Sequence, residues 1–484
     1  MNRRAFLQRT FLAGVSAATA VSAAPAKRPN ILFVMTDDQG PWSWGDGHPD
    51  ARTPHIDRLR AEGVHLANYF ASCPVCSPAR ASMLTSRYPL EFGFADYLPE
   101  SLDPTPGLDP SFPVWPRELQ RAGYRTGHVG KWHVGDSDRS HPTQLGYDYF
   151  AGWRHGARTS KDPVMEIEGA QRPMKGFTPD ILTDLALDFM GKGGDAPFLL
   201  SLHFWAPHAN TANKTPDGDR TWLPVSDGDW DLFKDITPTL PETRHPDLDV
   251  PRAERMTREY LASVHSVDRN LGRVLAALEA NGQADNTIVI YTSDHGFNMA
   301  HHGIWHKGNG RWLLENDQGN RANLWDNSLR APAFIRWPGK ITVGSTVTRT
   351  TSCLDWFPTL LSMAGVPHPE GVVLRGQDMA PLLRGETPAW NDDFFIQYDQ
   401  RASLPGSANM RGYRTPEWKL VRDFRNAGKD ELYHLTEDPG ELENLIASED
   451  GVVKEVVLRL DAKLKGMMVA VDDPLLEGSD SRAK

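Results

Sequence analysis

The chain has 484 residues, with 63 acidic against 52 basic side chains and a net charge of −11. This length allows a large hydrophobic core in one or more domains. This excess of acidic side chains argues against the basic surface that nucleic-acid binding needs. We therefore expect no nucleic-acid partner and favour small molecules or carbohydrates as ligands.

The first 26 residues have the ordered features of an export signal. Arg3 and Arg4 precede the weakly apolar stretch FLAGVSAATAVSAA, and small residues follow around Ala24 to Ala26. The stretch is too short to span a bilayer and resembles a twin-arginine signal, which predicts export to the bacterial periplasm or the medium. We expect the mature chain to begin near Lys27 without a membrane anchor; a disordered basic N-terminus is the alternative.

Three continuous apolar runs predict parallel strands that are buried on both faces. These runs are ILFVM at 31–35, PFLLSLHFW at 197–205 and TIVIY at 287–291. Thr53 followed by Pro54 predicts the N-cap and first residue of a helix that ends at Gly63. An apolar stripe predicts a longer helix over about residues 256–280. Strands that alternate with amphipathic helices indicate an α/β fold with a large, mostly parallel sheet sandwiched by helices.

The sequence pattern changes after about residue 385. The short segments FFIQY, WKLVRD and ELYHL predict a small antiparallel sheet, and the apolar spacing from Val453 to Leu464 predicts a closing helix. We therefore divide the chain into the signal at 1–26, an α/β domain at 27–385 and a C-terminal α+β subdomain at 386–484. Residues 209–252 and 308–326 are predicted to be long loops.

Two of the predicted strands end in acidic residues. ILFVMT leads into Asp37 and Asp38, and TIVIYTS leads into Asp294 and His295. Ligands of open α/β sheets bind beyond the carboxyl ends of the strands, so these side chains can converge on one site. Crowded carboxylates need a cation, and ligation dominated by oxygen favours Ca²⁺ or Mg²⁺. The alternative is that each pair caps a helix or solvates a strand end.

The segment CPVCSPARASMLTSR at 73–87 carries the most specific motif. The spacing of Cys73 and Cys76 also suits a redox pair or half a zinc site, but the sequence has no second such pair to complete a zinc site. The segment resembles the signature of the sulfatase family, Cys-x-Pro-x-Arg followed by a helical stretch that ends in Leu-Thr-x-Arg. The matching residues are Cys76, Pro78, Arg80, Leu84, Thr85 and Arg87. Ala79 and Ser86 stand where Ser and Gly are commoner in the family.

This resemblance implies a formylglycine-dependent sulfatase with the fold of the alkaline phosphatase superfamily. A maturation enzyme would oxidise Cys76 to formylglycine (3-oxoalanine), and one hydroxyl of its hydrate would attack sulfur to give a covalent sulfated intermediate. The second hydroxyl would then drive the release of sulfate. One ion, Ca²⁺ or Mg²⁺, would lower the pKa of the nucleophile and neutralise the charge of the sulfate. The implied metal ligands are Asp37, Asp38, Cys76, Asp294 and His295.

The segment GYRTGHVGKWHVG at 123–135 resembles a second sulfatase signature. The resemblance implies that Lys131 contacts the sulfate and the hydrate, and that His133 takes the hydroxyl proton that triggers elimination. Arg80 would anchor the hydrate through its rigid fork of donors. A Lys-x-His pair on its own is more often a solvated surface pair.

Two further segments supply implied site residues. PFLLSLHFWAPH ends at His208, which resembles the family histidine that protonates the leaving alcohol. HGIWHKG at 302–308 supplies Lys307 as the second sulfate-binding lysine. The neighbouring histidines, for which we favour a surface position, are His301, His302 and His306. Asp326 and Asn327 stand where the family usually has an acidic pair, a change that the sequence leaves without an interpretation.

Six tryptophans near these motifs suit either the stacking of sugar rings or core packing. They are Trp42, Trp44, Trp132, Trp205, Trp305 and Trp312. Bacterial sulfatases of this layout often desulfate polysaccharide fragments, so the resemblance favours a sulfated carbohydrate as substrate. Two alternatives stay open: a hydrolase of phosphodiesters or phosphonate monoesters, and a non-catalytic sulfated-glycan-binding protein in which Cys76 stays a thiol.

Overall fold

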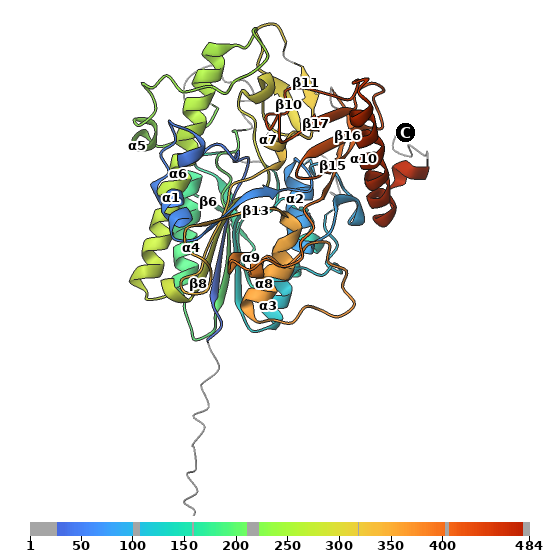
Figure 1. Cartoon of the computed structure of the whole chain (residues 1–484). Coiled ribbons are helices and arrows are strands. Elements are labelled where there is room, and N and C mark those ends of the chain that lie inside the picture. Colours follow the sequence, from blue (N-terminus) through green and yellow to red (C-terminus); the bar gives the residue numbers. More distant parts are fainter. Residues whose placement is uncertain are drawn as a thin grey trace, which may run out of the picture.

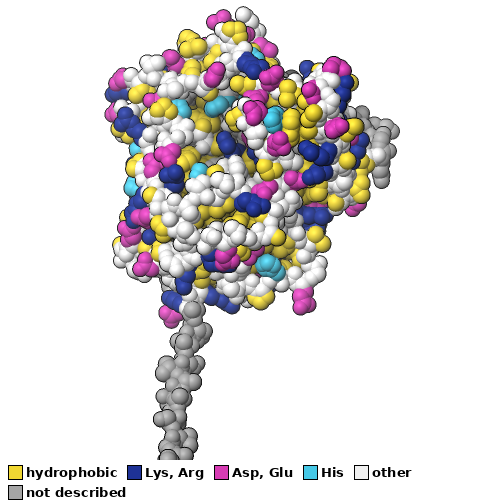
Figure 2. Space-filling model, viewed as in Figure 1, with side chains coloured by type: hydrophobic (Ala, Val, Ile, Leu, Met, Phe, Trp, Pro, Cys, Tyr) yellow, Lys and Arg dark blue, Asp and Glu magenta, His cyan; other side chains and the backbone are white. Residues whose placement is uncertain are grey.

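The computed structural model describes residues 27–99, 107–156, 159–210, 222–317, 319–401 and 406–477. The predicted export signal at 1–26 lies outside the described residues. A central sheet lies between two layers of helices, and a smaller sheet with one helix lies beside it (Figure 1). None of the helices in these ranges has both the length and the hydropathy needed to cross a membrane. Acidic and basic side chains are interspersed on the face that Figure 2 shows.

The central sheet has ten strands within the described residues, in the order β13-β2-β12-β8-β1-β7-β3-β4-β5-β6. β1 (Asn30–Thr36) pairs in parallel with both β7 (Phe198–His203) and β8 (Thr287–Ser293), which confirms the three predicted strands. Parallel pairing continues through β3 (Arg125–Lys131) to β4 (Tyr149–Trp153). The remaining strands are β2 (Val64–Phe70), β5 (Val164–Ile167), β6 (Ala170–Pro173), β12 (Ala333–Arg336) and β13 (Ser345–Ser352).

Helices cover both faces of this sheet. On one face lie α1 (Pro54–Ala61), α4 (Thr178–Gly191) and α6 (Val250–Ala280), and on the other lie α2 (Cys76–Thr85), α3 (Trp115–Arg121) and α8 (Trp356–Ala364) (Figure 1). Successive side chains of β1 point to opposite faces, so Phe33 packs in one apolar cluster and Val34 in the other. This two-sided burial explains why the central strands are continuous apolar runs.

The capping of α1 and the start of α6 differ from the sequence prediction. Thr53 precedes α1 as predicted, but its hydroxyl does not cap the helix. Instead, the Asp268 carboxylate from α6 accepts hydrogen bonds from the backbone N–H groups of His55 (3.0 Å) and Ile56 (2.7 Å). α6 itself starts at Val250, before the predicted residue 256, because the side chain of Asp249 caps its first turn.

The C-terminal residues form the predicted small antiparallel sheet and closing helix. Its strands are β14 (Phe394–Gln400), β15 (Ala408–Arg414), β16 (Trp418–Asp423) and β17 (Glu431–His434), and α10 (Gly451–Ala470) packs on β15 and β16. These elements share one apolar cluster with the α2 and α8 side of the central sheet. The predicted boundary at residue 385 falls between α9 (Ala380–Leu383) and β14, and it stays a prediction.

The two predicted long loops contain regular structure. The first holds α5 (Asp227–Trp230), and residues 211–221 within it lie outside the described ranges. In the second, β10 (Asn309–Trp312) pairs with β11 (Asn320–Ala322) and with β9 (Ile304–Trp305), and α7 (Asp326–Leu329) follows. The prediction of loops was wrong there because strands this short show no recognisable alternation in the sequence.

Candidate active site at the carboxyl ends of the central strands

The acidic residues that follow β1 and β8 meet at the carboxyl edge of the sheet. Thr36 at the end of β1 is in register with Ser293 at the end of β8, so Asp37 and Asp294 leave the sheet side by side. The backbone N–H of Asp38 donates to Asp294 Oδ1 at 3.3 Å. Asp38 has a φ of 67°, a left-handed conformation that is rare for a residue other than Gly and clusters at functional sites.

Cys76 is the first residue of α2 and lies against this acidic group. Its Sγ is 3.5 Å from Asp37 Oδ1 and 2.9 Å from Lys307 Nζ. Arg80 lies one turn later on the same side of the helix, as the four-residue spacing requires. Its Nε donates to Asp294 Oδ2 at 2.9 Å and its Nη1 to the Lys131 carbonyl at 3.0 Å, while its buried Nη2 has no hydrogen-bond partner among the described residues.

Two buried lysines contact the carboxylates. Lys131 at the end of β3 pairs with Asp37 Oδ2, and Lys307 after β9 pairs with Asp38 Oδ1. Gly308 lets the Lys307 segment approach the segment before Cys76 closely. A Cβ atom at this position would lie 2.3 Å from Pro74 Cγ, so a larger residue would not fit. The Lys307 ammonium group is thus fixed beside the Cys76 sulfur atom.

His133 follows β3 and is held in one tautomer. Its Nε2 donates to the Leu98 carbonyl at 2.9 Å, so Nε2 carries the proton and Nδ1 has a free lone pair. Nδ1 is buried and has no hydrogen-bond partner among the described residues. The arrangement suits the acceptance of a proton at Nδ1.

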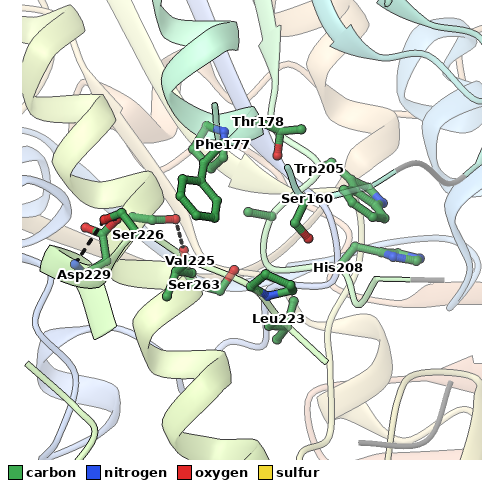
Figure 3. A pocket seen from close by; sticks show the side chains of 14 residues that line it. Ser160, Phe177, Thr178, Trp205, His208, Leu223, Val225, Ser226, Asp229 and Ser263 are labelled. Carbon is green, nitrogen blue, oxygen red and sulfur yellow. Dashed lines mark hydrogen bonds between the residues drawn. The ribbon is translucent and has the colours of Figure 1, made fainter. Parts of the chain in front are cut away.

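His208 lies on the other side of the acidic group. Its ring stacks on Trp205 with centroids 5.5 Å apart, and its Nδ1 donates to the Ala209 carbonyl at 2.9 Å. Its Nε2 lies 3.8 Å from Asp38 Oδ2. Figure 3 shows His208 at the edge of a hollow that is lined partly by serine and threonine hydroxyls. With about 10 Å³ of open space, this hollow has room for no more than a water molecule.

The buried charges shift the pKa values of the site. Burial alone would raise the pKa of Asp37, but Lys131, His208 and Arg80 hold it well below its usual range. Burial raises the pKa of the Cys76 thiol to about 12, and the charge of Asp37 adds to that effect. Unmodified Cys76 is therefore a protonated thiol at neutral pH in the metal-free site.

The site contains equal numbers of fixed cations and carboxylates. They are Arg80, Lys131, Lys307, Asp37, Asp38 and Asp294. Because these charges cancel, a bound divalent cation would leave a net positive site that attracts an anionic ester.

The donor atoms fit a divalent cation. Ligand atoms of Asp37, Cys76, Asp294 and His295 lie within 4.8 Å of one another, and the overlapping group of Asp37, Asp38, Cys76 and His208 does so as well. His295 Nδ1 donates to the Gly296 carbonyl, which leaves Nε2 unprotonated as in metal-bound histidines. Asp38 Oδ2 and His295 Nε2 are buried and have no hydrogen-bond partner within the described part of the chain, a costly state that a bound cation would relieve.

The structure brings together nine of the ten residues predicted for the site, while their individual roles stay predictions. They are Asp37, Asp38, Cys76, Arg80, Lys131, His208, Asp294, His295 and Lys307. The tenth, His133, interacts electrostatically with Lys131 and Arg80, and its hydrogen bond goes to the Leu98 carbonyl. The sequence reading missed Tyr260 in α6, whose hydroxyl donates to the Asp38 carbonyl at 2.6 Å and accepts from the Gly40 N–H at 2.9 Å. Tyr260 lies within the apolar stripe that predicts this helix, and no sequence signal separates it from the other residues there.

The structure distinguishes between the two alternatives for most of the tryptophans, and it shows that the surface position predicted for three histidines was wrong. Trp44, Trp132, Trp205 and Trp305 are at most 5% exposed, so they pack in the core and offer no face to a sugar. Trp42 and Trp312 are half-buried. The three histidines expected at the surface, His301, His302 and His306, are buried or half-buried, and His302 stacks on Trp325 with centroids 4.0 Å apart. They lie inside the molecule because β9 and β10 form part of the packed structure.

The chain matches a family model described as Sulfatase over residues 29–366 and a model described as N-sulphoglucosamine sulphohydrolase, C-terminal, over residues 319–470. It is 30% identical to an N-acetylglucosamine-6-O-sulfatase of Bacteroides thetaiotaomicron, over 89% of this chain and 84% of that protein. It is 31% identical to a steryl-sulfatase of Rattus norvegicus, over 78% and 74%. A structure solved in complex with its substrate D-glucosamine-2-N,6-O-disulfate aligns with a TM-score of 0.74 and 26% identity, over 93% and 99%.

Proposed function

The chain belongs to the sulfatase family and is a sulfuric ester hydrolase, and from that premise we propose that it removes O-sulfate groups from a carbohydrate. The observation that carries this proposal is the position of Cys76 Sγ, which lies between Lys307 Nζ and Asp37 Oδ1 at the start of α2. The carbohydrate is supported by the similarity to the bacterial N-acetylglucosamine-6-O-sulfatase and to the glucosamine disulfate complex.

We propose that Cys76 is oxidised to formylglycine by a maturation enzyme, as the Cys76, Pro78 and Arg80 signature implies. Hydrated formylglycine supplies an oxygen nucleophile that attacks sulfur. Because this oxidation replaces the sulfur by oxygen on the same carbon, the Cys76 sulfur atom marks about where an oxygen of the hydrated side chain would lie. Its position beside Lys307 and Asp37 gives this group a cation on one side and a candidate metal ligand on the other.

One divalent cation, Ca²⁺ or Mg²⁺, would be held by Asp37, Asp38, Asp294 and His295 together with the side chain of residue 76. Such an ion supplies positive charge that polarises a sulfate oxygen and lowers the pKa of a nearby hydroxyl. In this arrangement Lys131 and Lys307 hold their carboxylate partners in place and also present N–H donors to a sulfate group.

Two histidines would move protons in the proposed reaction. His133 would accept a proton at Nδ1, because the Leu98 carbonyl already occupies its Nε2–H. His208 would donate a proton to the leaving alcohol from Nε2 in its imidazolium form, because its Nδ1–H is already bonded to the Ala209 carbonyl and Asp38 Oδ2, 3.8 Å from Nε2, favours the charged ring. Arg80 Nη2 is a free buried donor that would orient the nucleophile.

The experiment that tests this proposal is a screen of protein from the native host against sulfated mono- and oligosaccharides, with release of sulfate as the readout. An aryl sulfate and an aryl phosphodiester are the reference substrates. We expect sulfate release from at least one sugar; faster turnover of the phosphodiester would instead favour a phosphodiester or phosphonate hydrolase. Mass spectrometry of the Cys76 peptide separates the enzyme from a glycan-binding protein, in which the thiol would stay unmodified.

We also propose that the Arg3–Arg4 segment directs export to the periplasm or the medium. Fractionation of the native host should place sulfatase activity outside the cytoplasm. An Arg3→Lys, Arg4→Lys double variant that is exported at the wild-type level would contradict twin-arginine export.

Removal of metal with a chelator should abolish activity. Addition of Ca²⁺ or of Mg²⁺ alone, followed by a measurement of restored activity, identifies the ion.

A further inference from the structure

A second hollow lies beside the loops that follow the candidate metal ligands in the chain. Trp42 follows Asp38 by four residues, His301 follows His295 by six, and both line this hollow together with Thr257 of α6. The hollow leaves about 160 Å³ open, whereas one water needs roughly 10–15 Å³ on the same scale. None of the residues assigned to sulfate contact is among its lining residues, so it is separate from the site at Cys76.

Trp42 forms a fixed aromatic wall of this hollow. One side of the indole stacks on Tyr260, with centroids 5.2 Å apart and an interplanar angle of 28°, and Tyr260 does not itself line the hollow. The indole N–H donates to the Phe297 carbonyl at 2.8 Å, which fixes the plane of the ring. The imidazoles of His48 and His301 flank it, each with its centroid 5.5 Å away. A rigid indole of this kind binds the apolar face of a ring at little cost in conformational entropy.

Thr257 lines the same hollow and carries a buried hydroxyl without a hydrogen-bond partner among the described residues. The residue is 2% exposed. A helical threonine usually donates to the carbonyl four residues earlier, as Thr183 does to Pro179 at 2.8 Å. A buried hydroxyl that makes no such bond is costly, and a ligand hydroxyl in the hollow would satisfy it.

The described lining residues carry no formal charge at neutral pH. They include no Asp, Glu, Lys or Arg. Burial lowers the pKa of His48, and it lowers the pKa of His301 to about 4, so both imidazoles are neutral. The hollow therefore has the polar groups for a hydroxylated ligand and lacks the cations that would bind a sulfate or a carboxylate.

We propose that this hollow is a second carbohydrate subsite, which binds a neutral, unsulfated sugar ring with its apolar face on Trp42 and a hydroxyl bonded to Thr257 Oγ1. The inference rests on the proposed carbohydrate substrate and extends it, since a site of this kind lets the enzyme bind a sugar that carries no sulfate. Binding there does not require oxidation of Cys76, because the lining residues are separate from the Cys76 site.

Isothermal titration of the metal-loaded, full-length enzyme with sulfate-free sugars tests the subsite directly. The probes are N,N′-diacetylchitobiose and a chemically desulfated glycosaminoglycan tetrasaccharide. We expect at least one to bind, with an affinity that falls about three- to tenfold in Thr257→Val, which keeps the shape and removes the hydroxyl. Trp42→Ala should lower the affinity about tenfold or more through the lost stacking surface.

Trp312→Ala is the matched control, because Trp312 is half-buried like Trp42 but does not line the hollow. It should bind the probes as the wild type does. The inference is overturned if neither probe binds the wild type, or if Thr257→Val binds the probes unchanged. Sulfate release by the same preparation reports on the proposed function separately. Binding of the probes without sulfate release would contradict the proposed function and leave the subsite in place. Sulfate release without binding of the probes would contradict the subsite alone.

Discussion

Two buried clusters of charges in this molecule differ in how fully the charges are paired. At the end of β1, Asp38 pairs with Lys307 through Oδ1, while its buried Oδ2 has no hydrogen-bond partner within the described residues. At the start of α7, Asp326 uses both oxygens: Oδ1 accepts from Lys419 Nζ at 2.8 Å, and Oδ2 accepts from Arg414 Nη2 at 3.1 Å.

This difference separates a binding site from a structural joint. The Asp38 oxygen without a hydrogen-bond partner lies where the candidate cation would bind, whereas the Asp326 carboxylate is bonded through both oxygens and holds elements together. Arg414 and Lys419 belong to β15 and β16, so Asp326 ties the C-terminal sheet to the central domain. This contact gives Asp326 a structural role that its sequence position alone left without an interpretation.

The largest effect that separates the two clusters is expected for Cys76→Ala. It should lower kcat for sulfate release by at least about ten-thousandfold, because it removes the proposed nucleophile, and leave thermal unfolding unchanged. The matched control is Cys73→Ala, since Cys73 is also buried and its thiol donates to the Ala95 carbonyl. An active Cys76→Ala enzyme would exclude a nucleophile derived from this residue.

Asp326→Ala should have the opposite profile. It leaves Arg414 buried without its carboxylate and Lys419 with the carboxylate of Glu441 alone, which should lower the free energy of unfolding by about 3 kcal/mol. Urea unfolding measures this loss, and the folded fraction should keep its kcat. Asp46→Ala is the control, because Asp46 forms an exposed pair with Arg60 worth less than about 1 kcal/mol. A variant that is as stable as the wild type would remove the structural role from Asp326.

His133→Ala should lower kcat on the order of a hundredfold, as expected for the loss of a proton acceptor. Lys131→Ala should have an effect of similar size, because it removes a cation that faces the developing charge. His141→Ala, which breaks a contact with Glu166 outside the site, is the control for the loss of a histidine. If the His133 variant lost no more activity than this control, the proton would go to another group.

The sequence predicted the part of the molecule in which neighbouring residues carry the signal. The apolar runs of β1, β7 and β8 and the polar residues directly after them predicted the sheet and the candidate metal ligands. Contacts between distant residues could not be predicted in this way. Tyr260 reaches Asp38 across 222 positions and Lys419 reaches Asp326 across 93, and only the packed tertiary structure makes such pairs.

The smallest effect concerns the cap of α1, where the sequence named Thr53 and the structure places Asp268. Asp268→Ala leaves two N–H groups at the start of the helix without an acceptor, which should lower the free energy of unfolding by about 1 kcal/mol near pH 5. Asp268→Asn keeps an acceptor oxygen and should lose less. A Thr53→Ala variant that is less stable than Asp268→Ala would return the dominant capping role to Thr53.

The dependence on pH sharpens this test of the cap. Burial raises the pKa of Asp268 to about 7, even though the Ile56 and His55 N–H groups act to lower it. Because the pKa in the folded state is above that in the unfolded state, the stabilisation is full at low pH and is lost as the pH rises through about 7. The stability of the wild type should therefore fall relative to Asp268→Asn between about pH 4 and pH 8. Urea unfolding of both proteins across this range measures the difference, and parallel pH profiles would mean that Asp268 is already ionised in the folded protein.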